Sequence, residues 1–324
     1  METLEPIQQT LREIDKRVPY SLRAAFGLAH RPVALPSDDG DIASFVASFF
    51  QPQDDGPGPA ETRGNDEEEE PRARAGLRMD WACYARDHDE DAHFGHGEAG
   101  VVGVADGVGG YRKRGVDAGA FSRGLMTAAF AEVCAAEPGT PVCPHTLLER
   151  AYEDTAASGA PGGSTAVILS LAPGGTDNTL RWAFIGDSAF AVFRGGRIVH
   201  RSRRQQKRFN HPLQLSAREG GVAKADVGEM AVREGDVVVV GTDGLFDNVF
   251  DGEIGVVVRM GTALGFSPKN MADVVAGVAY EMSRSNERDS PYSIDSRKHR
   301  GDRRHGGKPD DITVVVAFIV SAYS

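Results

Sequence analysis

Two apolar runs of this 324-residue chain end in the same Asp-Gly pair, and this pattern restricts the fold more than any other feature. Residues 101–105 lead into Asp106, and residues 237–241 lead, one threonine later, into Asp243. Short apolar runs bounded by glycine and aspartate are typical of buried strands. A third apolar run begins at residue 312, directly after two aspartates. The sequence therefore predicts several buried strands with carboxylates at their ends.

The spacing of the remaining runs predicts how the strands pair. Runs at 180–185, 189–193 and 197–200 leave no room for crossover helices, so this part must be antiparallel. Three helices are predicted, at 116–136, at 145–157 and from the Ser-Pro start at 267–268. Strand clusters separated by helical runs favour an α+β fold in which sheets pack together with helices outside.

Composition changes abruptly along the chain, which predicts three parts. Residues 1–50 form an N-terminal extension with two short amphipathic helices, and residues 51–79 form an acidic, Pro/Gly-rich linker predicted to be disordered. Residues 80–324 form the compact domain. The short helices could cover an apolar strip on that domain, which we favour because apolar helical stripes are usually packing faces, or dock a partner.

Bulk composition excludes several classes of protein. With 36 Lys+Arg against 47 Asp+Glu, the net charge of −11 argues against a nucleic-acid partner. The three cysteines form no C-x-x-C pair, and no apolar run approaches the ~18 residues of a membrane-spanning helix. We expect an intracellular, soluble monomer without membrane insertion. Acidic residues near the N-terminus favour the cytoplasm or nucleus over the mitochondrion or chloroplast.

The carboxylates at the strand ends suit one kind of chemistry. Taken alone, each Asp-Gly is as readily a simple turn. Together, Asp106, Asp243, Asp310 and the acidic cluster at 88–93 offer the oxygen ligands that Mg²⁺ and Mn²⁺ prefer. Two such ions ~3.5–4 Å apart can activate water and clamp both oxygens during displacement at phosphorus. Phosphoester hydrolysis follows from this arrangement.

Six motifs, in this order, resemble those of the PPM (type 2C) metal-dependent protein serine/threonine phosphatases. They are Glu-Asp-Ala at 90–92, Val-Ala-Asp-Gly-Val-Gly-Gly at 104–110, Gly-Ser-Thr-Ala at 163–166, Ile-Gly-Asp-Ser at 185–188, Thr-Asp-Gly-Leu-Phe-Asp at 242–247 and Lys-Pro-Asp-Asp-Ile-Thr at 308–313. The resemblance is closest to the branch with the yeast mitochondrial type 2C phosphatase and its plant relatives, judging by Gly-Val-Gly-Gly-Tyr at 107–111.

The resemblance implies a fold, a reaction and a set of site residues. The fold would be an α-β-β-α sandwich of two largely antiparallel sheets flanked by helices. A water bridging two Mg²⁺ or Mn²⁺ ions would attack phosphoserine or phosphothreonine in phosphoprotein substrates directly, and a third, looser ion is possible. The implied metal-binding residues are Glu90, Asp106, Gly107, Asp243 and Asp310. The implied catalytic residues are Asp106 and Asp187. Asp91 and Asp247 would lie behind the metal ligands, and Arg86 would bind the substrate phosphate.

One departure from the family pattern leaves alternatives open. Val108 stands where many members carry a histidine proposed to protonate the leaving group. The chain could therefore be a pseudophosphatase that binds phosphoproteins without turnover. A GDS-type serine esterase using Ser188 and His305 is a weaker alternative, because apolar alternation continues past the serine. The basic stretches 201–208 and 297–308 could receive acidic partners or be solvated loops.

Overall fold

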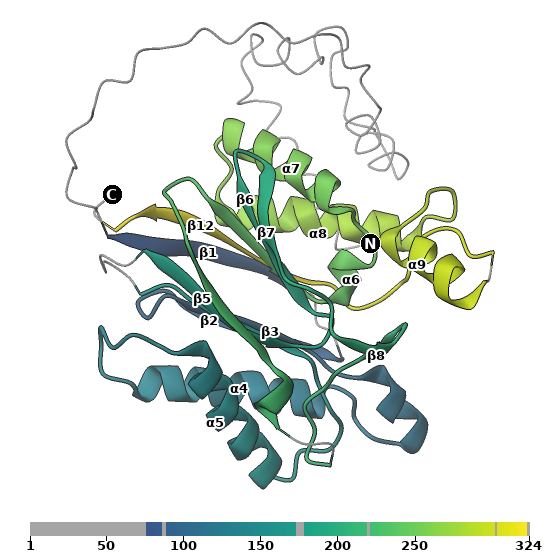
Figure 1. The fold of residues 1–324 in the computed structure, drawn as a ribbon, viewed down its shortest axis with the longest axis horizontal. Coiled ribbons are helices and arrows are strands. Elements are labelled where there is room, and N and C mark those ends of the chain that lie inside the picture. The colour runs from purple at the N-terminus through teal and green to yellow at the C-terminus, as the bar shows by residue number, and fades with distance from the viewer. Residues whose placement is uncertain (1–75, 86–88, 173–177, 219–220, 302, 323–324) are drawn as a thin grey trace, which may run out of the picture.

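The computed structural model describes residues 76–85, 89–172, 178–218, 221–301 and 303–322. These residues form two five-stranded sheets packed face to face, with helices on both outer sides (Figure 1). All strand pairs within the two sheets are antiparallel. The predicted α-β-β-α sandwich is therefore confirmed.

The first sheet has the order β1-β12-β11-β6-β7, with bounds β1 Leu77–Ala85, β12 Thr313–Ser321, β11 Val237–Gly241, β6 Ala189–Arg194 and β7 Arg197–Arg201. The second has the order β10-β5-β4-β3-β2, with bounds β10 Asp226–Ala231, β5 Thr179–Ile185, β4 Ala166–Ser170, β3 Val101–Asp106 and β2 Asp91–His96. A small hairpin joins β8 Gln206–Arg208 to β9 His211–Pro212.

Helices cover the outer faces of both sheets. Next to the second sheet lie α4 Ala120–Ala135 and α5 Pro144–Ala157, with the 3₁₀ turns η1 Gly109–Arg114 and η2 Val222–Lys224. The first sheet carries α6 Asp243–Phe246, α7 Asp251–Ala263, α8 Pro268–Arg284 and α9 Pro291–Arg300. In α8, Ser267 accepts a hydrogen bond from the amide of Asn270 and Pro268 occupies the first turn, as the sequence predicts.

The valine run of β11 shows why the sequence reads as continuously apolar there. Val238 and Val240 face the core between the two sheets, whereas Val237 and Val239 face the helix layer. All four are buried. A strand covered on both faces loses the apolar-polar alternation of a half-exposed strand, because each side chain enters one of two cores.

The antiparallel prediction for 180–200 needs one correction. β6 and β7 do pair antiparallel, but β5 pairs with β4 and β10 in the other sheet and not with β6. The turn at 186–188 therefore carries the chain from one sheet to the other. Gly186 allows this change of direction because its φ is 104°, a backbone conformation that residues with a side chain rarely adopt.

The domain also begins earlier than expected. β1 starts at Leu77, so the last three residues of the predicted 51–79 linker belong to the folded domain. Leu77 and Met79 are buried in the core between the sheets, where they pack with residues distant in sequence. The predicted helices and linker in residues 1–75 lie outside the described residues. Among the described helices, none is long and apolar enough to cross a membrane.

Candidate active site

Three aspartates from different parts of the fold meet at one end of the sandwich. Asp106 ends β3, Asp187 lies in the turn between β5 and β6, and Asp243 begins α6 directly after β11. One carboxylate oxygen from each lies within 4.8 Å of the others. Each sheet thus contributes one strand-end carboxylate, and the crossover between the sheets contributes the third.

Hydrogen bonds from the Gly-Ser-Thr-Ala motif hold the backbone of Asp106. Its amide donates to Thr165 Oγ1 at 3.1 Å, and Ser164 Oγ donates to its carbonyl at 2.9 Å. Thr165 Oγ1 also lies 2.6 Å from Ser188 Oγ, beside Asp187. The motif therefore positions two of the three carboxylates at once.

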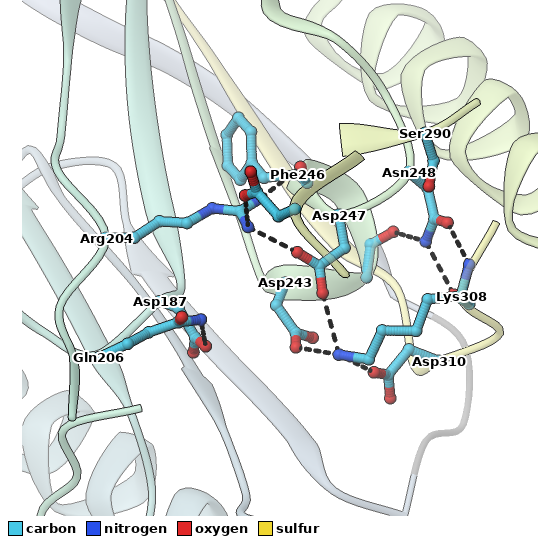
Figure 2. Close-up of polar contacts among 12 residues, drawn as sticks. Asp187, Arg204, Gln206, Asp243, Phe246, Asp247, Asn248, Ser290, Lys308 and Asp310 are labelled. Carbon is cyan, nitrogen blue, oxygen red and sulfur yellow. Dashed lines mark hydrogen bonds and ion pairs between the residues drawn. The ribbon is translucent and has the colours of Figure 1, made fainter. Parts of the chain in front are cut away.

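Asp187 has one oxygen engaged and one that is not. Gln206 Nε2 donates to Oδ2 at 2.8 Å (Figure 2). Oδ1 is buried and has no hydrogen-bond partner among the described residues. A buried carboxylate oxygen without a partner is costly unless a cation or water satisfies it. This oxygen is available to such a ligand.

Lys308 lies among three carboxylates of the same site. Its Nζ is 2.5 Å from Asp243 Oδ2, 3.0 Å from Asp247 Oδ2 and 2.9 Å from Asp310 Oδ2 (Figure 2). Asn248 holds the backbone of Lys308, because its Nδ2 donates to the Lys308 carbonyl at 2.9 Å and its Oδ1 accepts from the Lys308 amide at 2.8 Å. The ammonium is therefore built into the site.

The remaining predicted ligands surround this group. Glu90 is half-buried; its side chain pairs with Arg112 of η1, and its amide donates to Asp311 Oδ2 at 3.0 Å. Gly107 donates its amide to the Glu90 carbonyl at 3.0 Å. A Cβ at Gly107 would lie 2.2 Å from the Ala118 carbonyl oxygen, so this position excludes a side chain.

Two further aspartates, Asp91 and Asp247, lie next to residues of the cluster. Asp91 pairs in register with Asp106, is buried, and accepts a hydrogen bond from Thr242 Oγ1 at 2.9 Å. Asp247 pairs with Lys308 and with Arg204, whose Nη1 lies 2.8 Å from Asp247 Oδ1. Arg86, predicted to bind phosphate, lies outside the described residues.

Crowding of the carboxylates changes their protonation. Burial, reinforced by the charge of Asp243, raises the pKa of Asp187 to about 7 and that of Asp310 to about 7. For the same reasons the pKa of Asp106 lies well above its ordinary value, with Asp91 adding to the repulsion. The protein thus needs additional positive charge to keep the cluster ionised.

These observations fit a site for hard divalent cations. The donors are carboxylate oxygens from three chain segments, the ligands that Mg²⁺ and Mn²⁺ prefer. One of those oxygens, on Asp187, lacks a partner among the described residues. Ions binding here would offset the repulsion that raises the carboxylate pKa values.

The raised pKa values predict how metal-free stability depends on pH. A carboxyl group whose folded pKa exceeds its unfolded value binds protons more tightly when folded, so stability is lost as pH rises from the unfolded value toward about 7. In EDTA we expect the melting temperature to fall between about pH 5 and pH 7, and to fall less in D187N/D310N. Saturating Mn²⁺ should raise the melting temperature more at pH 8 than at lower pH, because the ion binds the deprotonated groups. A metal-induced shift independent of pH, measured by differential scanning fluorimetry, would contradict this.

Comparisons with known proteins agree with the geometry. The chain is 60% identical over 333 residues to "Putative protein phosphatase 2C 23" of Oryza sativa subsp. japonica, covering 100% of this chain and 99% of the relative. It is 38% identical over 235 residues to "Probable protein phosphatase 2C 80" of Arabidopsis thaliana, covering 72% of this chain and 55% of the relative. No family model matches the chain.

Solved structures show the same fold. The photosystem II phosphatase PBCP matches with a TM-score of 0.65 and 30% identity, over 76% of this chain and 100% of that one. The catalytic domain of the serine/threonine phosphatase PstP, in complex with two manganese ions, matches with a TM-score of 0.53 and 22% identity, over 75% and 99% of the two chains. At that identity the second match shows the fold alone.

Two stacked sheets with a carboxylate cluster at one end fit a metal-dependent phosphoester hydrolase. The chain belongs to the protein phosphatase 2C family. It is a protein serine/threonine phosphatase that uses Mg²⁺ or Mn²⁺, and its substrates are phosphoproteins.

The esterase alternative is not favoured by the surroundings of its residues. Ser188 is 1% exposed and its hydroxyl is bonded to Thr165, so it lacks the exposure of a nucleophile. His305 Nδ1 lies 3.0 Å from Asp289 Oδ1, next to α9. Both side chains therefore have other partners in this fold.

Sequence reasoning missed three residues that contact the cluster. Arg204 and Gln206 lie within the basic stretch 201–208, and Lys308 ends the stretch 297–308. Both stretches were predicted only to receive acidic partners or to be solvated loops. The one usable signal was that the stretch ending at Lys308 leads directly into Asp310.

Proposed function

We propose that Asp106 and Asp243 are the central metal-binding residues of this phosphatase, with Glu90, Asp310 and the Gly107 carbonyl completing a two-ion site. The observation that carries this assignment is the approach of oxygens from Asp106, Asp187 and Asp243 to within 4.8 Å of one another. Two ions at such a site would supply activated water and charge stabilisation at the phosphoryl group. Asp187 would then serve a looser third ion or ordered water.

The side chains around the cluster divide the remaining tasks. Asp106 is the last residue of β3 and Asp243 begins α6 one residue after β11, which fixes their positions before substrate arrives. Gln206 orients the Asp187 carboxyl group through its bond to Oδ2. Val108 carries no proton for the leaving group, so we assign proton delivery to water held by Asp187.

Direct attack by water, without a phosphoenzyme, is supported by the state of the nearby hydroxyl groups. Ser188 and Thr165 are both buried and bonded to each other at 2.6 Å. Neither is free to approach a phosphate at the mouth of the site.

Activity on a phosphothreonine peptide tests the proposed function. We expect purified full-length protein to release phosphate with Mn²⁺ or Mg²⁺ and to lose this activity in EDTA, because the carboxylate cluster alone supplies no electrophile. Ser188→Ala should leave chelator sensitivity unchanged. Metal-independent hydrolysis would refute the mechanism, and a folded, metal-loaded protein without turnover would identify a pseudophosphatase.

We further propose a monomer in the cytoplasm or nucleus, with residues 1–50 as an extension, 51–76 as a linker and the phosphatase domain from Leu77. The acidic N-terminal sequence supports this location over an organelle. Light scattering and imaging of a C-terminally tagged chain test the two statements separately.

A further inference from the structure

We infer that exposed basic residues beside the carboxylate cluster bind acidic side chains that flank the phosphorylated residue of the substrate. This inference rests on the proposed function and adds a substrate class to it. The surface, called here the basic ridge, consists of Arg208, Lys298, Arg300, Arg303 and Arg304, all exposed. It joins the β8–β9 hairpin to α9 and the loop that follows α9.

Aromatic contacts hold the two halves of the ridge together. The ring of Phe209, at the tip of the hairpin, lies 5.2 Å from that of Tyr292 and stacks on His299 at 5.6 Å. Arg300 lies 5.0 Å above the Phe209 ring and Arg304 lies 4.9 Å above the Tyr292 ring. Phe209 and Tyr292 are 83 residues apart in the sequence, so these contacts join two distant segments into one surface.

The ridge is attached to the cluster at both ends. Gln206, in the same hairpin, donates to Asp187 at 2.8 Å. Tyr292 donates its amide to the Asp247 carbonyl at 2.9 Å, and Lys308 Nζ lies 5.4 Å from the Tyr292 ring centre. Figure 1 places β8 and α9 at the same end of the sandwich as α6. A peptide with its phosphate at the cluster would thus lie next to the ridge.

Hydrogen bonds hold the loop that follows α9 against the residues before α9. Asp289 accepts hydrogen bonds from both terminal nitrogens of Arg297, at 2.6 and 2.7 Å. Arg297 also donates to the Arg304 carbonyl at 2.8 Å, and Ser290 Oγ donates to the Gly306 carbonyl at 2.8 Å. Because Arg297 offsets the charge of Asp289, that aspartate does not compensate the ridge.

The local charge is opposite to that of the whole chain. Residues 297–308 hold six Lys or Arg and one Asp, in a protein of net charge −11. An extended peptide spans ~3.3–3.6 Å per residue, so side chains two to four positions from the phosphoresidue lie ~7–14 Å along it. Acidic residues at those positions would meet the ridge, whereas basic ones would be repelled.

Steady-state kinetics on three substrates test the ridge. The substrates are a phosphothreonine peptide flanked by Asp and Glu, the same peptide with Asn and Gln, and p-nitrophenyl phosphate. Exposed charge pairs are weak individually, so we expect wild type to prefer the acidic peptide by about tenfold in kcat/KM, mainly through KM. The variant K298E/R303E should lose about fivefold or more of that preference and stay within about twofold on p-nitrophenyl phosphate.

A matched control separates position from net charge. R233E/R259E makes the same charge change at two exposed residues. Arg233 lies in the turn between β10 and β11, which leads into the end of β11 opposite Asp243. It should keep the preference. Equal kcat/KM for the two peptides, or equal loss in both variants, would overturn the inference.

Binding measurements distinguish failure of the ridge from failure of the proposed function. Fluorescence anisotropy with both peptides reports the preference even without turnover. Tighter binding of the acidic peptide by an inactive wild type would contradict the proposed function and support the ridge. Loss of affinity of K298E/R303E for phosphatidylserine vesicles, with no peptide preference, would overturn the inference in favour of a membrane surface.

Discussion

Replacing Asp106 by asparagine should abolish turnover and, in the absence of metal, make the protein more stable. Under the proposed assignment Asp106 would be a central metal ligand. Loss of even an outer partner of a metal ligand costs about 10- to 100-fold, so we expect activity to fall at least ~100-fold. The stability of the metal-free protein should rise, although activity falls. Burial and the charges of Asp243 and Asp91 raise the pKa of Asp106, which means that its ionised form is disfavoured in the folded protein.

Two measurements check this pair of effects. Differential scanning fluorimetry at pH 8 should give D106N a higher melting temperature than wild type in EDTA, and a smaller increase on adding Mn²⁺. Phosphate release from a phosphothreonine peptide gives the activity. Asp154→Asn is the matched control, because Asp154 is exposed on α5, away from the cluster, and should change neither quantity. A D106N protein that is destabilised in EDTA would contradict the electrostatic account.

Replacing Lys308 by methionine should make the metal-free protein less stable, the opposite of the effect expected for D106N. Its ammonium is the shared partner of Asp243, Asp247 and Asp310, and its side chain is 16% exposed. Removing one partner of a buried ion pair typically costs 3–5 kcal/mol, so for this partly exposed group we expect a loss of roughly 3 kcal/mol in EDTA. Mn²⁺ should restore much of it, because the ions replace the missing positive charge.

Urea unfolding with and without Mn²⁺ measures this effect. Arg150→Met is the control, since Arg150 of α5 pairs with Glu132 and the two side chains are 62% and 34% exposed. An ion pair at the surface contributes about 1 kcal/mol or less. If K308M unfolded in EDTA at the same urea concentration as wild type, Lys308 would not be the counter-ion of the cluster.

Much of the fold follows from local patterns. The helices α4, α5 and α8 and the strands β3, β5, β6, β7, β11 and β12 lie where periodicity and caps predict them. The missed elements are less distinct. In β10, side chains are half-buried or exposed along the whole strand, so it lacks the apolar run that marks a buried strand. In β1, buried Leu77 and Met79 are separated from the apolar run of its partner β12 by most of the chain.

The site divides in the same way. Asp106 and Asp243 are recognisable because each follows an apolar run that must be a strand, and motif order then adds Glu90, Asp187 and Asp310. Arg204 and Gln206 carry no comparable pattern, and Lys308 begins the sixth motif but follows no apolar run. Their contacts with the cluster depend on where a hairpin and a loop return to it, which no local spacing encodes.

The sequence alone determined the strand-end aspartates and the helix caps, because these depend on neighbours within a few residues. It also determined the six motifs and their order, because each motif is a short run that can be recognised without the fold. Tertiary structure alone decided that β5 and β6 lie in different sheets, which brings Asp187 beside Asp106 and Asp243. It also decided that one ammonium serves three carboxylates and that Phe209 meets Tyr292. These contacts join distant segments, and their energy comes from burial and charge that exist only once both sheets have packed.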